Sequence, residues 1–581
     1  MEMVNIKINN MPLSVPKGIS ILEAARTAGI EIPTLCYLKK INEIGACRIC
    51  MVEVKGARSL VTACVYPVNE GMEIFTNTAR VRKSRKMTLE LILSTHDRKC
   101  LSCVRSGTCE LQQLCKEFGV DDEGRFDGAN PVHEYDDSAI HMIRDNGKCI
   151  LCRRCVAACQ AQHISVIGAN ARGFDTHIGS AFEKPLDSVA CVSCGQCIVN
   201  CPTGAIYEKD DTAKVLEAIN DPEKFVVVHT APSIRVTLGE CFGMHIGTNV
   251  QGKMVAALRR LGFDKVFDTD FGADLTIVEE ANEFLGRVQN GGVLPMITSC
   301  SPGWVNYAEY NYPDQLDHLS SCKSPHEMMG AIIKSYFAEK NGLDPKNIFV
   351  VSIMPCTAKK FEKERPQLAV NGLPDVDCVL TTRELGDLIK RSGINFNALP
   401  DEEFDSDLLG DYSGAGVIFG VTGGVMEAAL RTAYYVLTGK EHELIKFEQV
   451  RGTDGIKEAS YTVNGMEVKV CVVSGLANAN TIMEKVKNGT ADYHFIEIMG
   501  CPGGCVNGGG QPIQHAVVRN FVDLRARRAA ALYEADKDMP LRKSHESEAV
   551  KRLYAEFLGE PGSHKAHEVL HTSYVARPKY K

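Results

Sequence analysis

Cysteines are the most chemically informative residues of this chain: 24 of its 581 residues are cysteine, and most lie in closely spaced groups. A thiolate binds zinc and iron–sulfur clusters, or forms disulfides where the surroundings are oxidising. The first residues, MEMVNIKINN, lack a charged segment followed by an apolar one, so we expect no export signal and a reducing, cytoplasmic setting. The cysteine groups are therefore predicted to bind metals, and their spacing indicates which metals.

The most specific spacing is C-x2-C-x2-C-x3-C, which occurs in both KCILCRRCVAAC and ACVSCGQCIVNCP. In bacterial ferredoxins with two 4Fe-4S clusters, the fourth cysteine of each such run ligates the cluster of the other run. The proline typical of this pattern, Pro202, follows only the second run. We therefore predict a two-cluster ferredoxin domain over residues 138–209. Its predicted ligands are Cys149, Cys152, Cys155 and Cys201 for one cluster, and Cys191, Cys194, Cys197 and Cys159 for the other.

Residues 1–78 carry four cysteines in the order C-x10-C-x2-C-x13-C. The apolar runs of NIKINNMPLSV, followed by the helix-like ILEAARTAG, predict a small β-rich fold with one helix. Zinc also suits four thiolates, and the spacing differs from the C-x4-C-x2-C of plant-type ferredoxins. The pattern resembles the 2Fe-2S domain of respiratory complex I large subunits and of related hydrogenases, which implies a β-grasp, ferredoxin-like domain. The implied ligands of one 2Fe-2S cluster are Cys36, Cys47, Cys50 and Cys64.

Residues 79–120 contain the pattern H-x3-C-x2-C-x5-C within HDRKCLSCVRSGTCELQQLC. One imidazole and three thiolates suit structural zinc as well as they suit iron. The pattern also resembles the 4Fe-4S site with one histidine and three cysteines that is found in the same two families. Cys115 lies outside it and is interpreted as structural. The implied ligands are His96, Cys100, Cys103 and Cys109.

Composition narrows the class of protein. The chain is 44% hydrophobic and 24% charged with a formal net charge of -8, which is typical of a soluble globular protein and argues against nucleic-acid binding. No apolar run approaches the roughly 18 to 20 residues of a membrane span. The basic stretch ARVRKSRK, residues 79–86, is interpreted as a solvated helix face, with a docking surface for an acidic redox partner as the alternative. The glycines of GAGVIFG, residues 414–420, do not match a dinucleotide fingerprint, so no nucleotide site is expected.

From about residue 210, apolar strands alternate with amphipathic helices, which predicts an α/β domain with mostly parallel sheets over residues 210–520. Ligands of such sheets gather at the carboxyl ends of the strands. Three cysteine motifs follow strand-like runs: TSC after VLPMI, MPC after NIFVVSI, and MGCPGGC after YHFIEI. The fold can therefore bring four thiols to one place. They are Cys300, Cys356, Cys501 and Cys505.

At these motifs the chain resembles the FeFe hydrogenases, whose signatures are TSCCPxW, MPCxxKxxE and ExMxCxxGCxxGGGQP. Here they read TSCSPGW, MPCTAKKFE and EIMGCPGGCVNGGGQP. The resemblance covers essentially the whole chain and implies an H-cluster, in which a 4Fe-4S cube is joined to a diiron unit carrying CO, cyanide and an azadithiolate. It implies that Cys356 and Cys501 hold the cube and that Cys505 bridges to the diiron unit. Around that unit, it implies a cyanide-binding role for Lys359, packing by Met354 and Met499, and a further cyanide contact at Pro232 and Ser233.

The first signature departs from the family, because its second cysteine is Ser301. In the family the first of the two cysteines donates protons and the second ligates the cube, whereas a serine oxygen is a poor ligand for a cluster that prefers thiolates. We favour Cys300 as the cube ligand after a local backbone shift, with Ser299 or Ser301 taking over the proton step. The alternative keeps Cys300 as the donor and takes the fourth ligand from Cys322.

The resemblance also implies a proton path through Glu283, Ser320, Glu280 and Cys300. The two glutamates lie at i and i+3 and would share a helix face, and partial burial would raise their pKa values toward neutrality. Without the family, EEANE would be interpreted as a solvated helix face. HEVLH near the C-terminus fits the HExxH zinc pattern but has no obvious third ligand downstream. It resembles a C-terminal segment of these hydrogenases, which implies a helical segment, 521–581, that wraps the catalytic domain.

Together these features predict a multidomain α+β and α/β protein that interconverts H2 with protons and electrons. Its expected cofactors are one 2Fe-2S cluster, three accessory 4Fe-4S clusters and the H-cluster. The expected partners are ferredoxin or redox subunits of a larger complex, of the NAD(P)-linked bifurcating or formate dehydrogenase type, and maturation proteins for the diiron unit. The alternatives are an electron-transfer subunit like that of complex I and a low-activity hydrogen sensor.

Overall fold

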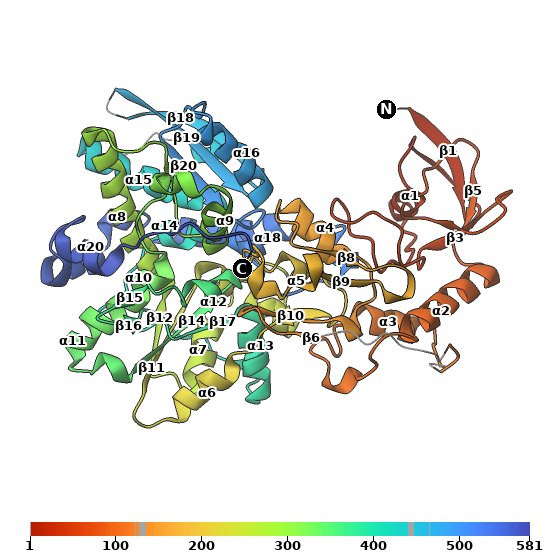
Figure 1. Ribbon diagram of the computed structural model, residues 1–581, viewed down its shortest axis with the longest axis horizontal. Coiled ribbons are helices and arrows are strands. Elements are labelled where there is room, and N and C mark those ends of the chain that lie inside the picture. The colour runs from red at the N-terminus through yellow and green to blue at the C-terminus, as the bar shows by residue number, and fades with distance from the viewer. Residues whose placement is uncertain (1, 122–123, 127–134, 440–446, 464, 581) are drawn as a thin grey trace.

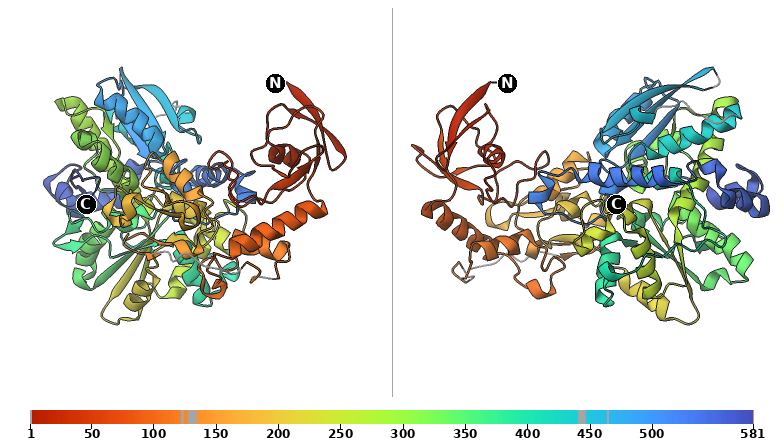
Figure 2. Two further views of the ribbon diagram at one scale, coloured as in Figure 1. Left: turned by 45° about the vertical axis from the view of Figure 1, so that its right-hand side comes forward. Right: turned by 180° about the vertical axis from the view of Figure 1, so that it is seen from behind.

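The computed structural model describes residues 2–121, 124–126, 135–439, 447–463 and 465–580, so small parts of the expected domains 1–78, 210–520 and 521–581 lie outside the described residues. The N-terminal modules lie at one end of the molecule and the α/β part at the other, with the two-cluster region between them (Figures 1 and 2). None of the described helices is long and apolar enough to cross a membrane.

The first module is a five-stranded sheet with the order β2-β1-β5-β3-β4, as its alternating apolar residues predict. Every second residue of β1 is buried, beginning with Val4. Helix α1 is N-capped by Ser20, and the side chains of Ser20 and Glu23 form a capping box. The elements are β1 (Met3–Ile8), β2 (Met11–Pro16), α1 (Ile21–Thr27), β3 (Met51–Val54), β4 (Val61–Thr62) and β5 (Glu73–Phe75).

Two helices, α2 (Ala79–Leu93) and α3 (Glu110–Glu117), connect this module to the two-cluster region. The basic stretch forms the start of α2, and Arg82 is exposed as expected. Arg85 is buried instead and donates a hydrogen bond to the Met51 carbonyl at 2.8 Å, so this part of the helix anchors to β3.

In the two-cluster region, each cysteine run leads into a short helix, α4 (Arg154–Ala161) or α5 (Gln196–Asn200), and these two helices pack together. Small strands frame them, with β7 antiparallel to both β6 and β10 and β8 antiparallel to β9. They are β6 (Tyr135–Asp136), β7 (Met142–Asp145), β8 (Ile167–Asn170), β9 (His177–Ser180) and β10 (Ile206–Glu208).

Two four-stranded sheets form the α/β part. The first has the order β12-β11-β14-β17 and is parallel throughout, and the second has the order β13-β20-β19-β18, with only β18 antiparallel to its neighbour. The alternation of strands and helices predicted this parallel pairing. The strands are β11 (Phe225–Thr230), β12 (Lys265–Asp268), β13 (Met296–Ile297), β14 (Ile348–Met354), β17 (Cys378–Thr381), β18 (Ile456–Val463), β19 (Met466–Ser474) and β20 (Phe495–Met499).

Helices cover both sheets, and the longest, α8 (Thr269–Asn290), packs against α10, α14 and α15. The core consists of valine, leucine, isoleucine and phenylalanine side chains from the strands and the inner helix faces. The other helices here are α6 (Thr212–Asn220), α7 (Gln251–Leu261), α9 (Pro302–Asn311), α10 (Pro325–Ile332), α12 (Ala358–Glu362), α13 (Thr382–Arg391), α14 (Gly414–Val417), α15 (Gly424–Thr438) and α16 (Leu476–Lys487).

The C-terminal segment runs back over the α/β part, as Figure 2 shows from behind. Helix α18 (Leu524–Asp538) packs on α14, and α20 (His564–Leu570) packs on α10. Between them, α19 (Glu548–Leu553) contacts α8. This segment therefore ends beside the helix that carries Glu280 and Glu283.

Candidate active site

A cavity lies where the predicted cysteine loops of both sheets meet. Cys356 follows β14 of the first sheet, and Cys501 follows β20 of the second. This is the carboxyl-end position at which parallel sheets gather ligands. The predicted residues that line the cavity are Pro232, Cys300, Ser301, Met354, Cys356, Lys359, Met499, Cys501 and Cys505.

Close backbone approaches explain the glycines of the third motif. A Cβ on Gly509 would lie 2.4 Å from the Cys194 carbonyl oxygen and 2.6 Å from the Gly195 Cα. Gly504 has a φ of +97°, and a Cβ there would lie 2.6 Å from the Thr422 nitrogen. Only glycine lets the cysteine loop pack this tightly against its neighbours.

Lys359 is buried at the cavity wall and is held by two polar contacts. Its Nζ lies 2.7 Å from Glu362 Oε2 and donates to the Cys300 carbonyl at 3.2 Å. Burial alone would lower the pKa of Lys359, but the Glu362 carboxylate outweighs it, so the pKa is raised and the amine stays charged. His326 also contacts Glu362, at 2.7 Å from Nε2 to Oε2, which fixes that carboxylate.

Glu362 and His326 are site residues that the sequence patterns left without a role. Glu362 is the last residue of the MPCTAKKFE motif, so its place in the signature was the available signal. No motif pointed to His326, which reaches the cavity because the N-terminus of α10 turns toward it. Ser233 lies nearby rather than on the cavity wall, and its Oγ accepts a hydrogen bond from Gln511 Nε2 at 3.2 Å.

Ser301 and Cys300 both reach the cavity but have different neighbours. Ser301 is the N-cap residue of α9, and its Oγ accepts a hydrogen bond at 3.0 Å from the backbone nitrogen of Gly500, next to Cys501. Burial raises the pKa of the Cys300 thiol, and the charge of Glu280 raises it further. Ser301 therefore lies beside the expected cube ligands. Cys300 lies near Glu280, a residue of the expected proton path.

Cys322 is not among the cavity-lining residues. Its thiol donates instead to Glu283 Oε2 at 3.7 Å, and its backbone pairs with that of His571 in an isolated antiparallel bridge. Ser299 Oγ donates to the Cys322 carbonyl at 2.8 Å. Cys322 therefore lies beside Glu283 and away from the cavity wall, and the alternative in which it supplies the fourth ligand of the cube stays a prediction.

The carboxyl groups of α8 are not a solvated helix face, because Glu280 is only 1% exposed. Within the described residues, neither Glu280 carboxyl oxygen has a hydrogen-bond partner. Burial, followed by the nearby charge of Glu283, raises the pKa of Glu280 to about 8. Ser320 Oγ donates to Glu283 Oε2 at 2.8 Å, and Arg287 binds Glu283 Oε1 at 2.7 Å.

The cysteines of the two-cluster region lie close to one another. Burial raises the pKa of the Cys155 thiol, and the nearby thiols that add to this effect are Cys152, Cys149, Cys201 and Cys197. Burial likewise raises the pKa of Cys197, with contributions from Cys194, Cys191 and Cys159. The fourth cysteine of each run therefore lies with the other run, which is the crossed arrangement of two-cluster ferredoxins.

The second of these groups adjoins the cavity. Thr357 Oγ1, next to Cys356, donates to the Ser193 carbonyl at 2.8 Å, and Gln196 Nε2 donates to the Asn507 carbonyl at 2.9 Å. The loop that carries Cys194 is thus packed directly on the loops of two cavity cysteines.

The first group adjoins both N-terminal sites. Asn42 Nδ2 donates to the carbonyls of Cys36 at 2.8 Å and Cys152 at 2.9 Å. On another side, a Cβ on Gly204 would lie 2.6 Å from the Cys103 sulfur, so the chain around Cys103 packs on the chain that follows Cys201. Both N-terminal cysteine groups therefore lie against the part of the two-cluster region that carries Cys152 and Cys201.

Both N-terminal sites have donor sets that fit metal clusters. Cys36, Cys47, Cys50 and Cys64 are all buried, and the Cys36 backbone nitrogen donates to Cys47 Sγ at 3.3 Å. The Nδ1 of His96 is buried and, in the described part of the chain, makes no hydrogen bond. Burial lowers the pKa of His96, so its imidazole is neutral and able to act as a ligand. Cys115 packs outside this set, in the core that contains Leu111 and Leu114.

HEVLH does not form a zinc-protease site. Glu568 is exposed and pairs with Lys565 at 3.5 Å. The rings of His567 and His571 lie 3.9 Å apart, and His571 Nδ1 contacts Ser321 Oγ at 2.8 Å. No sequence pattern indicated that His571 reaches Ser321, beside the outer end of the expected proton path.

Family models match almost the whole chain in five segments. Residues 224–509 match the iron-only hydrogenase large subunit, C-terminal domain, and residues 522–577 match the iron hydrogenase small subunit. Residues 1–79 match a 2Fe-2S iron-sulfur cluster binding domain. Residues 85–123 match the NADH-ubiquinone oxidoreductase-G iron-sulfur binding region, and residues 148–205 match a 4Fe-4S dicluster domain.

Individual hydrogenases are also similar to this chain in sequence and structure. The chain is 48% identical to the NADP-reducing hydrogenase subunit HndD of Solidesulfovibrio fructosivorans over the full length of both. It is 44% identical to iron hydrogenase 1 of Clostridium pasteurianum, over 98% of this chain and all of that one. An apo FeFe hydrogenase structure from Chlamydomonas reinhardtii matches 64% of this chain and 100% of its own, with 42% identity and a TM-score of 0.57.

Proposed function

The chain belongs to the iron-only (FeFe) hydrogenase family and is an oxidoreductase acting on H2. From this premise we propose which of its residues hold the H-cluster, which transfer protons and which carry electrons. The observation that carries the proposal is the cavity in which Cys356, Cys501 and Cys505 converge beside Lys359. Three thiols in one enclosed space are a donor set for an iron–sulfur cluster. The apolar wall around them, including Met354 and Met499, would exclude water from a bound diiron unit.

We propose that Cys356, Cys501 and Cys505 hold the cube of the H-cluster, with Cys505 shared with the diiron unit. When bound, the H-cluster supplies an open iron site at which H2 is split or formed. Lys359 would donate a hydrogen bond to a cyanide ligand, since Glu362 keeps its amine charged and oriented. Pro232 would contact the diiron unit, and Ser233 would act through Gln511.

Ser301 is proposed as the fourth residue at the cube and Cys300 as the proton donor. The support is the position of each residue. Ser301 contacts the backbone next to Cys501, and Cys300 lies near enough to Glu280 for its charge to raise the pKa of the Cys300 thiol. This assignment differs from the backbone-shift scheme favoured by the sequence, since it needs no local rearrangement. A serine oxygen would hold iron less firmly than a thiolate does.

Protons are proposed to move between Cys300 Sγ, the Glu280 carboxyl, Ser320 Oγ and the Glu283 carboxyl. A raised pKa of about 8 lets Glu280 take up and release protons near neutral pH. The hydrogen bond from Ser320 to Glu283 supplies the outer link.

Electrons are proposed to pass through one 2Fe-2S and three accessory 4Fe-4S clusters. The two clusters of residues 138–209 would lie in line, with the Cys194 cluster next to the cavity. The 2Fe-2S cluster of residues 1–78 and the His96 cluster of residues 79–120 would both deliver to the cluster held by Cys152 and Cys201. The contacts through Asn42 and Gly204 support this branching.

The electron partner is proposed to be a redox subunit of a larger complex, since a full-length relative is named as the subunit of an NADP-reducing hydrogenase. Ferredoxin is the alternative, as is a complex of the formate dehydrogenase type. The diiron unit would be supplied by maturation proteins.

The test is an infrared spectrum of the matured protein under argon and then under H2. Bands of iron-bound CO and cyanide that shift with the gas are expected if the cavity holds a working H-cluster. Protein that carries all its accessory clusters and shows no such bands would instead be an electron-transfer subunit.

A further inference from the structure

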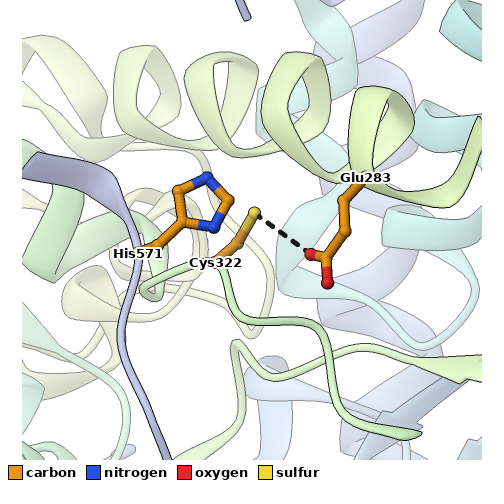
Figure 3. Close-up of side chains that lie close together, drawn as sticks. All are labelled: Glu283, Cys322 and His571. Carbon is orange, nitrogen blue, oxygen red and sulfur yellow. Dashed lines mark hydrogen bonds between the residues drawn. The ribbon is translucent and has the colours of Figure 1, made fainter. Parts of the chain in front are cut away.

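Three metal-binding side chains meet at the outer end of the proposed proton path. Glu283 comes from α8, Cys322 from the loop before α10, and His571 from the residue that follows α20 (Figure 3). One ligand atom from each lies within 4.8 Å of the others. The three segments are far apart in the sequence, and the backbone bridge between Cys322 and His571 holds two of them in register.

Their chemistry is that of a zinc site. Zinc is bound by cysteine sulfur, histidine nitrogen and carboxylate oxygen, and three such ligands leave a fourth position for water. With bond lengths of about 2.3 Å to sulfur and about 2.0 Å to oxygen, a tetrahedral zinc ion places these two ligand atoms about 3.5 Å apart. The observed distance from Cys322 Sγ to Glu283 Oε2 is 3.7 Å. Binding therefore requires only small side-chain movements.

Neighbouring groups hold the three side chains in place. Arg287 binds Glu283 Oε1, while Glu283 Oε2 accepts hydrogen bonds from Ser320 Oγ at 2.8 Å and from the Cys322 thiol at 3.7 Å. The ring of His571 is oriented by Ser321 Oγ at 2.8 Å and by Glu279 Oε2 at 3.2 Å. One ring nitrogen can bind a metal while the other keeps its partner, as is usual for histidine ligands.

The electrostatic surroundings favour a dication. Burial raises the pKa of the Cys322 thiol, and the charges of Glu283, Glu280 and Glu279 raise it further. A zinc ion would offset the negative charge of Glu283 and Glu279 that Arg287 does not balance, and the thiol proton would leave to solvent as the thiolate binds. The side chains of Glu283 and His571 are 14% and 6% exposed, so the site adjoins solvent.

A second cluster with suitable side chains does not compete as a candidate. This second cluster consists of His326, Glu327 and Glu362. All three are buried, and Glu362 already forms an ion pair with Lys359. Of these two clusters of described residues, the one at Cys322 combines a thiol with partial exposure.

We propose that Glu283, Cys322 and His571 bind one zinc ion, and that zinc there stops proton transfer by occupying the Glu283 carboxylate. The second part rests on the proposed role of Glu283 in the proton path, whereas the first part does not. Zinc would then act as a reversible inhibitor of H2 turnover that leaves the cavity untouched.

The experiment uses the full chain with all its iron–sulfur clusters in place, so that zinc cannot enter empty cluster sites. Equilibrium dialysis with zinc chloride and metal analysis are expected to show one zinc ion per chain. Zinc-edge X-ray absorption is expected to show one sulfur ligand at about 2.3 Å. Cys322→Ala and His571→Ala should each weaken binding at least tenfold. Cys471→Ala, which removes a thiol equally buried in β19, is the matched control and should bind as the parent does.

Unchanged zinc stoichiometry and affinity in Cys322→Ala would overturn the site. Turnover is compared with and without zinc within each variant, and zinc should slow the parent and Cys471→Ala but not Cys322→Ala. If zinc binds with the sulfur ligand and turnover is unaffected, the inhibition is overturned, and with it the role of Glu283 in the proposed function, while the metal site stands. His571→Ala serves as the second variant if the cavity left by Cys322→Ala disturbs folding.

Discussion

Glu280 is the residue on which the proposed proton path depends most. It is buried, it lies between the solvent side at Glu283 and the thiol of Cys300, and its carboxyl oxygens make no hydrogen bond of normal geometry with a described residue, although Ser320 and the Ser299 backbone are near enough to oppose the rise in its pKa. A buried carboxyl group with a pKa near neutrality suits a proton carrier far better than it suits a structural role.

Glu280→Gln keeps the size of this side chain and removes its ability to ionise. We expect H2 turnover to fall by about 100-fold or more, which is the usual range for the loss of a positioned acid or base. The infrared bands of the H-cluster should remain, since Glu280 does not line the cavity. Glu568→Gln, on the exposed face of α20, is the control and should retain full turnover. Unimpaired turnover in Glu280→Gln would rule out this path.

The same carboxyl group makes stability depend on pH. The pKa of Glu280 is raised from 4.5 to about 8, so between these values the folded protein holds a proton that the unfolded chain releases. Its contribution is fully present below about pH 4.5 and is lost as pH rises toward 8. We therefore expect the apparent Tm of the parent, relative to Glu280→Gln, to fall between pH 5 and pH 8. A difference that does not change with pH would show that Glu280 ionises normally.

Ser301 is a second residue whose role can be tested directly. Ser301→Cys would place a thiolate beside the Cys501 loop, so we expect the cube to resist chelators for longer and the CO and cyanide bands to shift. Ser299→Cys is the matched control, because the Ser299 hydroxyl is directed at the Cys322 carbonyl. If Ser301→Cys changes nothing and Cys300→Ala loses the cube, then Cys300 is the ligand and the backbone-shift scheme is correct.

At the scale of elements, the loops after β14 and β20 hold the site by tight backbone packing. Gly509 lies against Cys194 and Gly195 of the two-cluster region, with no room for a side chain. The motif GGGQP therefore joins the catalytic loop to the last accessory cluster in addition to shaping the cavity.

Gly509→Ala should push these two loops apart. We expect a loss of about 1–3 kcal/mol in the free energy of unfolding, as for other overpacked sites, and slower reduction of the H-cluster from the Cys194 cluster. Stopped-flow infrared spectroscopy after addition of a reductant would measure the rate. Gly286→Ala on α8 is the control, since a Cβ there meets no atom within 4 Å and alanine favours a helix. Equal rates in both variants would mean that the packing does not control electron transfer.

Local sequence patterns predicted the elements well, because cysteine spacing and strand–helix alternation are short-range signals. The parallel pairing of β11 with β14 and the crossed cysteine groups both follow from such patterns. The neighbours of Cys322 could not be predicted, since His571 lies 249 positions further along and reaches it only through the path of the C-terminal segment. The burial of Arg85 within a basic stretch could not be predicted either, because its hydrogen-bond partner, Met51, lies on another element.

At the scale of the whole molecule, buried polar contacts join the cluster modules into one series. Arg154 on α4 binds Glu110 on α3 at 2.9 Å and donates to the carbonyls of Cys36 and Tyr37. Glu110 also accepts a hydrogen bond from the Ala516 nitrogen at 3.2 Å. A single ion pair thus contacts the first module, the His96 module, the two-cluster region and the end of the α/β domain.

Arg154→Ala would leave the Glu110 carboxylate buried without its partner. Breaking a buried pair in this way costs about 3–5 kcal/mol, so we expect the N-terminal modules to separate from the rest at lower denaturant concentrations. Limited proteolysis and the loss of iron–sulfur absorbance during denaturation would both detect this. Lys17→Ala removes the exposed pair with Glu2 and should change stability by less than about 1 kcal/mol. If Arg154→Ala resists protease as the parent does, other contacts must hold the modules together. Asn42, which bridges Cys36 and Cys152, would then be the next residue to replace.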